Sequence, residues 1–249
     1  MLNSNWNGKR VCFLGDSITE GVGVKFGERY LDILGNELDI DVHGYGVNGA
    51  RFRNLMEQAK KMNADFRKNI DAIFLFAGTN DFNGSMPLGN WFNVCEEELI
   101  LSKNIDNSLS TIQMRKKRSF NMDISTFCGS INSVLSFLKH NYADKQIVLI
   151  TPLHRSYANF GCDNIQYNEL YSNRIGLFID DYVSMVRQAA YVWSTELIDL
   201  YSISGLFPLF DESAHYFANF DTDRLHPGKE GHIRIAKAIK SKMNNIALY

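Results

Sequence analysis

A serine follows the first apolar run of the chain, in the segment Gly15-Asp16-Ser17. The run before it, residues 10–14, has the length and apolar character of a buried strand, and open parallel sheets bind ligands beyond the carboxyl ends of their strands. A serine hydroxyl becomes an effective nucleophile only when a base lies within hydrogen-bond reach. Ser17 is therefore a candidate nucleophile, although serine in such a position also commonly caps a helix.

A histidine and an aspartate lie three residues apart in the segment D-R-L-H-P, residues 223–227. Histidine is the side chain best suited to accept and return a proton near neutral pH. Asp223 could fold back in a turn and hold the His226 imidazole in the required tautomer. Pro227 restricts His226 to an extended backbone, which fixes where the ring emerges. The same segment could instead be a turn whose aspartate caps the last helix.

Two further polar segments follow the second and third apolar runs, V-N-G-A at residues 47–50 and G-T-N-D at residues 78–81. Acyl transfer requires hydrogen-bond donors at the oxygen that becomes negatively charged in the transition state. Gly49 can bring its backbone N–H close to a ligand because it has no Cβ, and Asn80 can supply a side-chain amide. A tight turn and a helix cap would explain each segment separately. Four such segments, three of them at successive strand ends, are hard to attribute to turns and favour acyl transfer.

Taken together, the four segments resemble the motifs of the SGNH hydrolases, also called the GDSL esterase/lipase family. The resemblance extends from residue 10 to the last predicted helix, and Ile18 stands where the family name has leucine. It implies an α/β fold, a flavodoxin-like three-layer α/β/α sandwich. It also implies a five-stranded parallel sheet in the order 2-1-3-4-5.

The resemblance further implies a role for residues in each of the four segments. The catalytic residues would be Ser17 as nucleophile, His226 as general base and Asp223 as the residue that orients the histidine. The oxyanion hole would consist of the backbone N–H groups of Ser17 and Gly49 and the side-chain amide of Asn80. The implied activity is hydrolysis of a carboxylic ester by a serine esterase that uses no cofactor and no metal.

The elements that must position these residues follow from the hydrophobic pattern. Short apolar runs alternate with segments of helical periodicity, which is typical of a parallel α/β sheet. The predicted strands cover residues 10–14, 39–43, 72–76, 146–150 and 196–200. Continuously apolar runs in the first, third and fourth of these strands indicate that helices cover both faces of the sheet.

Amphipathic helices are predicted where apolar residues recur at i, i+3, i+4 and i+7. Such stripes lie within residues 131–138, 179–190 and 235–243, and we expect their apolar side chains to pack in the core. All four prolines fall outside the predicted helix interiors, which supports these boundaries.

We expect a single domain over residues 1–249, with insertions at about 83–122 and 203–222. Long insertions in compact domains are often lids or binding loops. The first insertion contains the basic run of residues 115–118, which we expect to be a solvated loop or helix face. The second insertion is rich in aromatic residues.

Composition excludes several classes of function. Lys and Arg number 26 and Asp and Glu number 28, so the net charge of the 249 residues is -2, without the basic footprint of a nucleic-acid-binding protein. No apolar stretch reaches the roughly 18 residues that indicate a membrane span. The four cysteines are widely spaced and predict neither a disulfide framework nor a zinc site. Residues 1–10 lack a signal-peptide core, so a cytoplasmic location is the default expectation, or a secreted or periplasmic one if a leader has been removed.

Three residues outside the four segments are candidates for substrate binding. His154 and Arg155 follow the fourth predicted strand, where they could shape the pocket or form a structural pair, and Trp91 lies in the first insertion. We expect a small-molecule acyl ester as substrate, first of all an acetyl ester of a carbohydrate, by analogy with the family. The alternatives are a lipase or thioesterase of the same family, or a non-catalytic carbohydrate-binding module on this fold.

Other acidic residues and histidines allow a second chemistry to be weighed. Asp16, Asp81, Asp223 and His226 could bind a metal in a phosphoesterase, but the missing second histidine argues against this interpretation. We expect Asp16 and Asp81 to hold their loops through hydrogen bonds to the backbone. We expect His232, in the last helix, to be structural.

Overall fold

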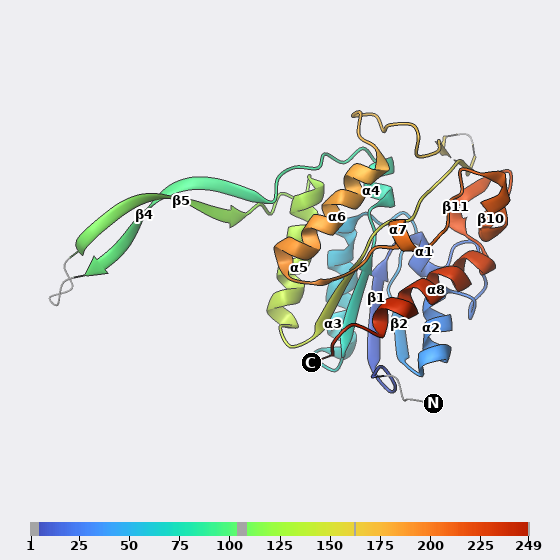
Figure 1. Cartoon of the computed structure of the whole chain (residues 1–249), viewed down its shortest axis with the longest axis horizontal. Helices are drawn as coiled ribbons and strands as arrows, with labels where there is room; N and C mark the ends of the chain where they lie inside the picture. Colours follow the sequence, from blue (N-terminus) through green and yellow to red (C-terminus); the bar gives the residue numbers. More distant parts are fainter. Residues whose placement is uncertain (1–4, 104–108, 162, 249) are drawn as a thin grey trace.

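The computed structural model of the chain describes residues 5–103, 109–161 and 163–248. Its centre is a five-stranded parallel sheet in the order β2-β1-β3-β6-β9 (Figure 1). Numbered along the chain, this order is 2-1-3-4-5, which confirms the predicted α/β/α fold. The strands are β1 (Arg10–Gly15), β2 (Asp41–Gly44), β3 (Ala72–Phe76), β6 (Gln146–Ile150) and β9 (Glu196–Ile198).

Helices cover both faces of this sheet. One face packs against α3 (Leu55–Phe66), α5 (Phe127–Asn141) and α6 (Ile179–Trp193), and the other packs against α2 (Tyr30–Leu38) and α8 (Lys229–Met243). Because successive strand residues point to opposite faces, alternate side chains of β1, β3 and β6 enter two separate hydrophobic clusters. This arrangement explains the continuous apolar runs in these strands, at residues 11–14, 72–76 and 147–150.

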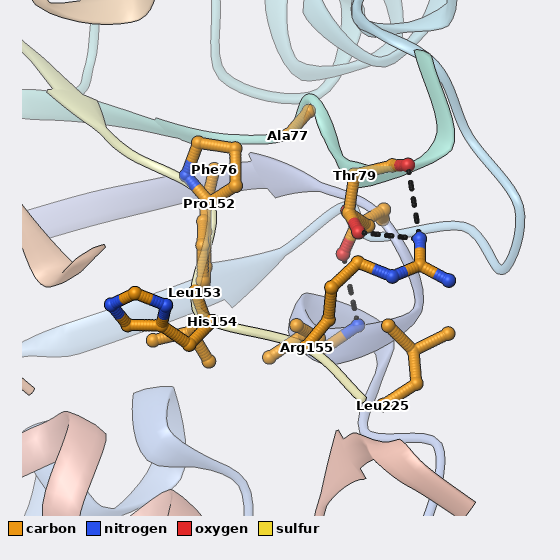
Figure 2. Close-up of a pocket in the computed structure, with 10 residues that line it drawn as sticks. Phe76, Ala77, Thr79, Pro152, Leu153, His154, Arg155 and Leu225 are labelled. Atoms are coloured by element: carbon orange, nitrogen blue, oxygen red, sulfur yellow. Dashed lines mark hydrogen bonds between the residues drawn. The ribbon is translucent and has the colours of Figure 1, made fainter. Parts of the chain in front are cut away.

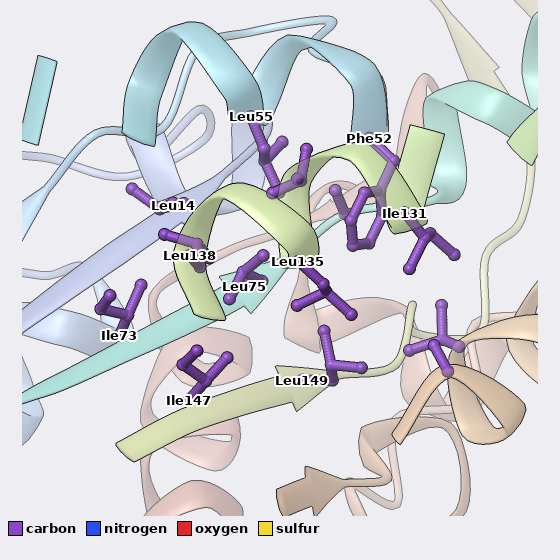
Figure 3. Close-up of a cluster of buried hydrophobic side chains, with 14 of the residues drawn as sticks. Leu14, Phe52, Leu55, Ile73, Leu75, Ile131, Leu135, Leu138, Ile147 and Leu149 are labelled. Carbon is purple, nitrogen blue, oxygen red and sulfur yellow. The ribbon is translucent and has the colours of Figure 1, made fainter. Parts of the chain in front are cut away.

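The cluster beneath α5 shows how the predicted stripes pack (Figure 3). Ile131, Leu135 and Leu138 of α5 lie over Leu75 and Leu149 of the sheet, and all five side chains are fully buried. Full burial of such a side chain contributes about 1.5–3 kcal/mol to the free energy of unfolding. The stripes of α6 and α8 are buried as well, so the three predicted helical stripes are confirmed.

Two predicted strands have different ends in the structure. Residue 39 is not in β2, because Asp39 is the left-handed C-cap of α2, with φ 55°, and its N–H donates to Gly35 O. The fifth strand ends at Ile198 rather than residue 200, because α7 (Leu200–Ile203) begins there. The Asp199 carboxylate accepts hydrogen bonds from Thr151 Oγ1 and from side chains around α7, which turns the chain out of the sheet.

A second sheet, which the hydrophobic pattern did not predict, lies beside the carboxyl ends of the central strands. It is antiparallel in the order β10-β11-β7-β8. Its strands are β7 (Ala158–Asn159), β8 (Ile165–Gln166), β10 (Phe217–Asn219) and β11 (Asp223–Pro227). The second predicted insertion contains β10 together with the short helix η2 (Asp211–Tyr216).

The first predicted insertion forms a long hairpin of β4 (Phe92–Lys103) and β5 (Leu109–Phe120), called the arm below. Figure 1 shows the arm projecting from the α5 and α6 side, away from the body of the molecule. The basic run lies on β5, so it is a strand rather than the expected loop or helix face, and it is exposed. Within the arm, Lys117 Nζ forms an ion pair with Glu97 Oε2 at 2.6 Å.

None of the helices in the described part of the chain has the length and apolar character needed to cross a membrane.

Candidate active site

Ser17 is the first residue of α1 (Ser17–Glu20), directly after β1. Asp16 is the N-cap of this helix, and its Oδ1 accepts the Ile18 N–H at 3.0 Å. The backbone N–H of Ser17 has no acceptor among the residues that the structure describes, as helix geometry leads one to expect of a first helical residue. The strand end is held by Gln58, whose amide both donates to and accepts from the Gly15 backbone at 2.8 Å.

Asp223 and His226 both lie on β11, and the Asp223 carboxylate contacts both the ring and the backbone of His226. His226 Nδ1 is 2.8 Å from Asp223 Oδ2, while Asp223 Oδ1 accepts the backbone N–H of His226 at 3.0 Å and that of Leu225 at 3.1 Å. An ionised carboxylate only accepts hydrogen bonds, so the hydrogen between the two side chains is on Nδ1. The Nε2 atom of His226 is then free to accept a proton.

The hydroxyl of Ser17 meets that nitrogen. Ser17 Oγ is 3.0 Å from His226 Nε2, across 209 residues of sequence, and the two residues are 3% and 5% exposed. The contact joins the central sheet to the second sheet. The structure thus brings together the serine, histidine and aspartate that the sequence analysis singled out.

Gly49 lies in the turn after β2 with φ 76°, a left-handed conformation that favours glycine. A Cβ at this position would meet nothing within 4 Å, so it is the backbone conformation and not crowding that calls for glycine here. Glu20 anchors the turn, because its carboxylate accepts the N–H of Asn48. The N–H of Gly49 itself has no acceptor within the described ranges.

Asn80 is the second residue of α4 (Thr79–Asn83). Its Nδ2 donates to Ala50 O at 3.0 Å, which uses one of its two hydrogens and links α4 to the Gly49 turn. The next residue, Asp81, accepts the Phe52 N–H at 2.9 Å, at the start of η1 (Phe52–Asn54). Asp16 and Asp81 therefore do hold their loops through backbone hydrogen bonds.

Residues from all four sequence segments line one cleft of about 380 Å³, called the first cavity below. Its lining is mostly polar, with apolar side chains from Val22, Phe160 and Leu225. Asp223 lies behind His226 and does not line it. The lining comprises Ser17, Val22, Asn48, Gly49, Arg51, Asn80, Asn83, Gly84, Phe160, Asn164, Gln166, Leu225 and His226.

His154 and Arg155 point in opposite directions from the loop after β6 (Figure 2). His154 Nδ1 is 2.6 Å from Glu169 Oε1, and its ring stacks on Tyr201 at a centroid distance of 3.7 Å. His154 lines neither the first cavity nor the second one described below. Its contacts are those of a packed structural residue.

Arg155 is 1% exposed and connects two loops of the site. Its Nη1 donates to the Thr79 carbonyl and hydroxyl at 3.5 and 3.3 Å, as Figure 2 shows, and its Nη2 donates to Gln166 Oε1. Burial lowers the pKa of its guanidinium to about 10, which leaves it charged at neutral pH. The side chain therefore ties α4 to β8.

Trp91 lies at the base of the arm. Its Nε1 donates to Gln188 Oε1 at 3.1 Å, and its carbonyl accepts from Asn132 Nδ2. The residue lines neither the first nor the second cavity.

Several buried groups around the site have shifted pKa values. Burial raises the pKa of Asp16 to about 6 and that of Asp81 to about 7, because the lost hydration outweighs the hydrogen bonds and the charge interactions, with His226 and Arg51 respectively, that lower these pKa values. Burial lowers the pKa of His232 to about 4, and its Nδ1 accepts the Tyr30 N–H at 3.1 Å. His232 is therefore neutral at pH 7 and packs α8 against α2.

No group of three or more His, Cys, Asp or Glu side chains in the described residues is arranged to hold a metal ion. The sequence analysis missed polar residues that line the first cavity, notably Asn83, Asn164 and Gln166. No local pattern could have identified them, because Asn83 ends a short helix, Gln166 lies in a strand of two residues, and Asn164 precedes that strand.

Solved structures of bacterial proteins share this fold over almost the whole chain. A protein from Lactobacillus plantarum is 23% identical, with a TM-score of 0.72 over 97% of this chain and 99% of that one. A possible lipase from Chitinophaga pinensis is 18% identical, with a TM-score of 0.67 over 95% and 98% of the two chains. An acetyl xylan esterase is 20% identical, with a TM-score of 0.56 over 94% and 98%.

The fold and these likenesses define a three-layer α/β/α sandwich around a parallel sheet. The model of the GDSL-like Lipase/Acylhydrolase family matches residues 13–234, so the chain belongs to this family and is a carboxylic ester hydrolase. No curated protein matches the chain.

Proposed function

We propose that this protein is a serine esterase in which Ser17 attacks the ester carbonyl and His226 is the general base. One observation carries the proposal: Ser17 Oγ lies 3.0 Å from His226 Nε2, while His226 Nδ1 lies 2.8 Å from the Asp223 carboxylate. A nucleophile bonded to a base, which is itself oriented by a third group, is the arrangement that activates a serine.

In the proposed reaction, His226 removes the Ser17 proton as the hydroxyl oxygen bonds to the carbonyl carbon. The tetrahedral oxyanion receives hydrogen bonds from the N–H groups of Ser17 and Gly49 and from the second amide hydrogen of Asn80. His226 then protonates the leaving alcohol, and the acyl group remains on the serine. A water molecule, deprotonated by His226, releases the acid by the same steps in reverse order.

The lining of the first cavity favours a small acyl group. Its lining is mostly amide, hydroxyl and backbone groups, whereas a long acyl chain would require a continuous apolar surface. We therefore propose a short acyl ester such as acetate, carried by a carbohydrate. The structural likeness to an acetyl xylan esterase is in keeping with this substrate class.

Hydrolysis of p-nitrophenyl acetate, butyrate and octanoate by the wild type and Ser17→Ala tests the proposal. We expect the rate to fall with chain length and Ser17→Ala to lower it by roughly 10⁴-fold or more. Ser133→Ala is the control, because Ser133 lies on α5 and lines neither the first cavity nor the second cavity described below. This variant should hydrolyse the acetate at the wild-type rate. A fluorophosphonate probe should label Ser17, and a chelator should leave the rate unchanged. Near-normal hydrolysis by Ser17→Ala would refute the assignment.

A further inference from the structure

A second cavity adjoins the first. Its volume is about 370 Å³, close to the 380 Å³ of the first cavity, and both are in the usual range of small-molecule sites. Asn83, Asn164 and Gln166 line both cavities, so the two spaces meet along these residues. An ester whose carbonyl carbon lies at Ser17 therefore has room for its alcohol part in the second cavity.

Amide groups in the second cavity have hydrogen-bonding capacity to spare. Asn164 Oδ1 accepts from Gln166 Nε2 at 3.1 Å, and Asn168 Oδ1 accepts from Leu170 N at 3.1 Å. The NH₂ groups of both asparagines have no acceptor in the described part of the chain. They can donate to hydroxyl groups, which both accept and donate hydrogen bonds.

Two tyrosines add aromatic surface to this cavity. Tyr167 and Tyr171 are 64% and 61% exposed, and their ring centroids are 5.5 Å apart with the planes at 48°. Aromatic rings this exposed leave apolar faces available to a ligand. A sugar ring has an apolar C–H face and a rim of hydroxyls, so it could stack on a tyrosine while its hydroxyls reach the amides.

The charges of the second cavity favour a neutral ligand. Asp163 and Arg174 contribute one exposed charge of each sign. The guanidinium of Arg155, which also lines the cavity, is already bonded to Thr79 and Gln166. The two exposed charges offset one another, so the net exposed charge of the cavity favours neither an acidic nor a basic ligand.

We propose that the second cavity binds the alcohol part of the substrate and that this part is a neutral carbohydrate. Tyr167 and Tyr171 provide its stacking surface, and the amides of Asn164 and Asn168 bind its hydroxyls. This inference rests on the proposed function, since it takes Ser17 as the point of attack.

Two substrates separate this inference from the proposed function. The first, methyl acetate, depends on the chemistry at Ser17 and has an alcohol part too small to stack on the tyrosines, and the second, an acetylated cello-oligosaccharide, needs the second cavity as well. We expect Tyr167→Ala/Tyr171→Ala to raise KM for the acetylated sugar about tenfold and to lower the ratio of kcat/KM for the acetylated sugar to kcat/KM for methyl acetate by a similar factor. Tyr191→Ala is the matched control, because Tyr191 is 91% exposed on α6 and lines neither cavity.

Binding of the same oligosaccharide to Ser17→Ala, followed by saturation-transfer NMR, gives a readout that does not need catalysis. We expect binding that the double tyrosine substitution abolishes. The inference is overturned if the wild type hydrolyses methyl acetate but not the acetylated sugar, or if the tyrosine variant hydrolyses both substrates like the wild type. If the sugar binds but Ser17 is inert toward both esters, the proposed function fails while the carbohydrate site stands.

Discussion

The side chain of Asn80 illustrates how a single residue is prepared for its proposed role. One of its two amide hydrogens is already bonded to the Ala50 carbonyl, which fixes the plane of the amide. The other hydrogen can then point at an oxyanion without any rearrangement, which is where such donors are most effective. The bond also couples the α4 loop to the turn that carries Gly49.

We expect Asn80→Ala to lower kcat roughly 10²–10³-fold, with a small effect on KM, because the amide acts mainly on the transition state. Steady-state kinetics with p-nitrophenyl acetate measure this effect. Asn141→Ala is a matched control, since Asn141 Nδ2 also donates to a backbone carbonyl, that of Phe137, but lies on α5. A wild-type kcat for Asn80→Ala would mean that the backbone N–H groups of Ser17 and Gly49 stabilise the oxyanion without the Asn80 amide.

At this scale the sequence was most informative about residues that lie at strand ends. Ser17, Gly49, Asn80 and His226 could be named because each stands in a short polar segment beside an element with a clear pattern. Arg155 could be named only as a candidate for substrate binding, and its contacts between two loops could not be predicted. The groups it contacts, Thr79 and Gln166, are distant in sequence, so its burial is a tertiary property.

The arm is the element that departs most from expectation. A two-stranded ribbon with both faces in water is only marginally stable by itself, and its outer edges could pair with other strands. Charged side chains counter such pairing: Glu96 and Glu97 on β4 lie opposite Lys116 and Arg115 on β5. The basic run thus has a physical explanation as part of an exposed ribbon.

We expect excision of residues 93–119, with an Asn-Gly turn joining Phe92 to Phe120, to leave the rate on p-nitrophenyl acetate within about twofold. Phe92 and Phe120 are paired, with ring centroids 5.2 Å apart, so a short turn can join them. The described residues of this segment line neither cavity. Kinetics and a thermal melt check this, and a loss of activity without loss of folding would show that the arm supports the site.

Elements with a clear apolar pattern were predictable, as in the continuous runs of β3 and β6 and the i, i+3, i+4 stripe of α5. The second sheet was not, because β7 and β8 have two residues each and show no periodicity. Their pairing depends on contacts with β11 from far along the chain. The strand that carries His226 was therefore found as a motif but not as a strand.

For the molecule as a whole, the buried ionisable groups set how stability depends on pH. The pKa of Asp81 is about 7 in the folded protein against an ordinary value of 3.8, so the folded state keeps a proton that the unfolded state has lost. Each carboxyl group with a raised pKa lowers the free energy of unfolding by about 1.4 kcal/mol per pH unit as pH rises from its pKa in the unfolded state to its pKa in the folded state. Asp16 acts in the same direction up to about pH 6, and His232 acts in the opposite direction between about pH 4 and 6.5.

We expect Asp81→Asn to be more stable than the wild type, by an amount that grows from about pH 4 to about pH 7 and is constant above it. The neutral amide removes the penalty of burying a charge, while its oxygen can still accept the Phe52 N–H. Urea unfolding at a series of pH values measures the difference. Asp221→Asn, at an exposed position, is the control. A difference independent of pH would mean that Asp81 is ionised throughout this range.

The bridge made by Arg155 also limits how the enzyme can acquire new substrates. One end of the guanidinium holds Thr79, which precedes Asn80 in α4, and the other holds Gln166, which lines both cavities. Under the proposed mechanism, a substitution at Gln166 that accommodates a different alcohol also loosens the contacts that position Asn80, so affinity and turnover cannot be optimised independently there. Tyr167, Tyr171 and Asn168 have no hydrogen bond to Arg155 among the described residues, so we expect substitutions at these positions to alter specificity without slowing the chemistry.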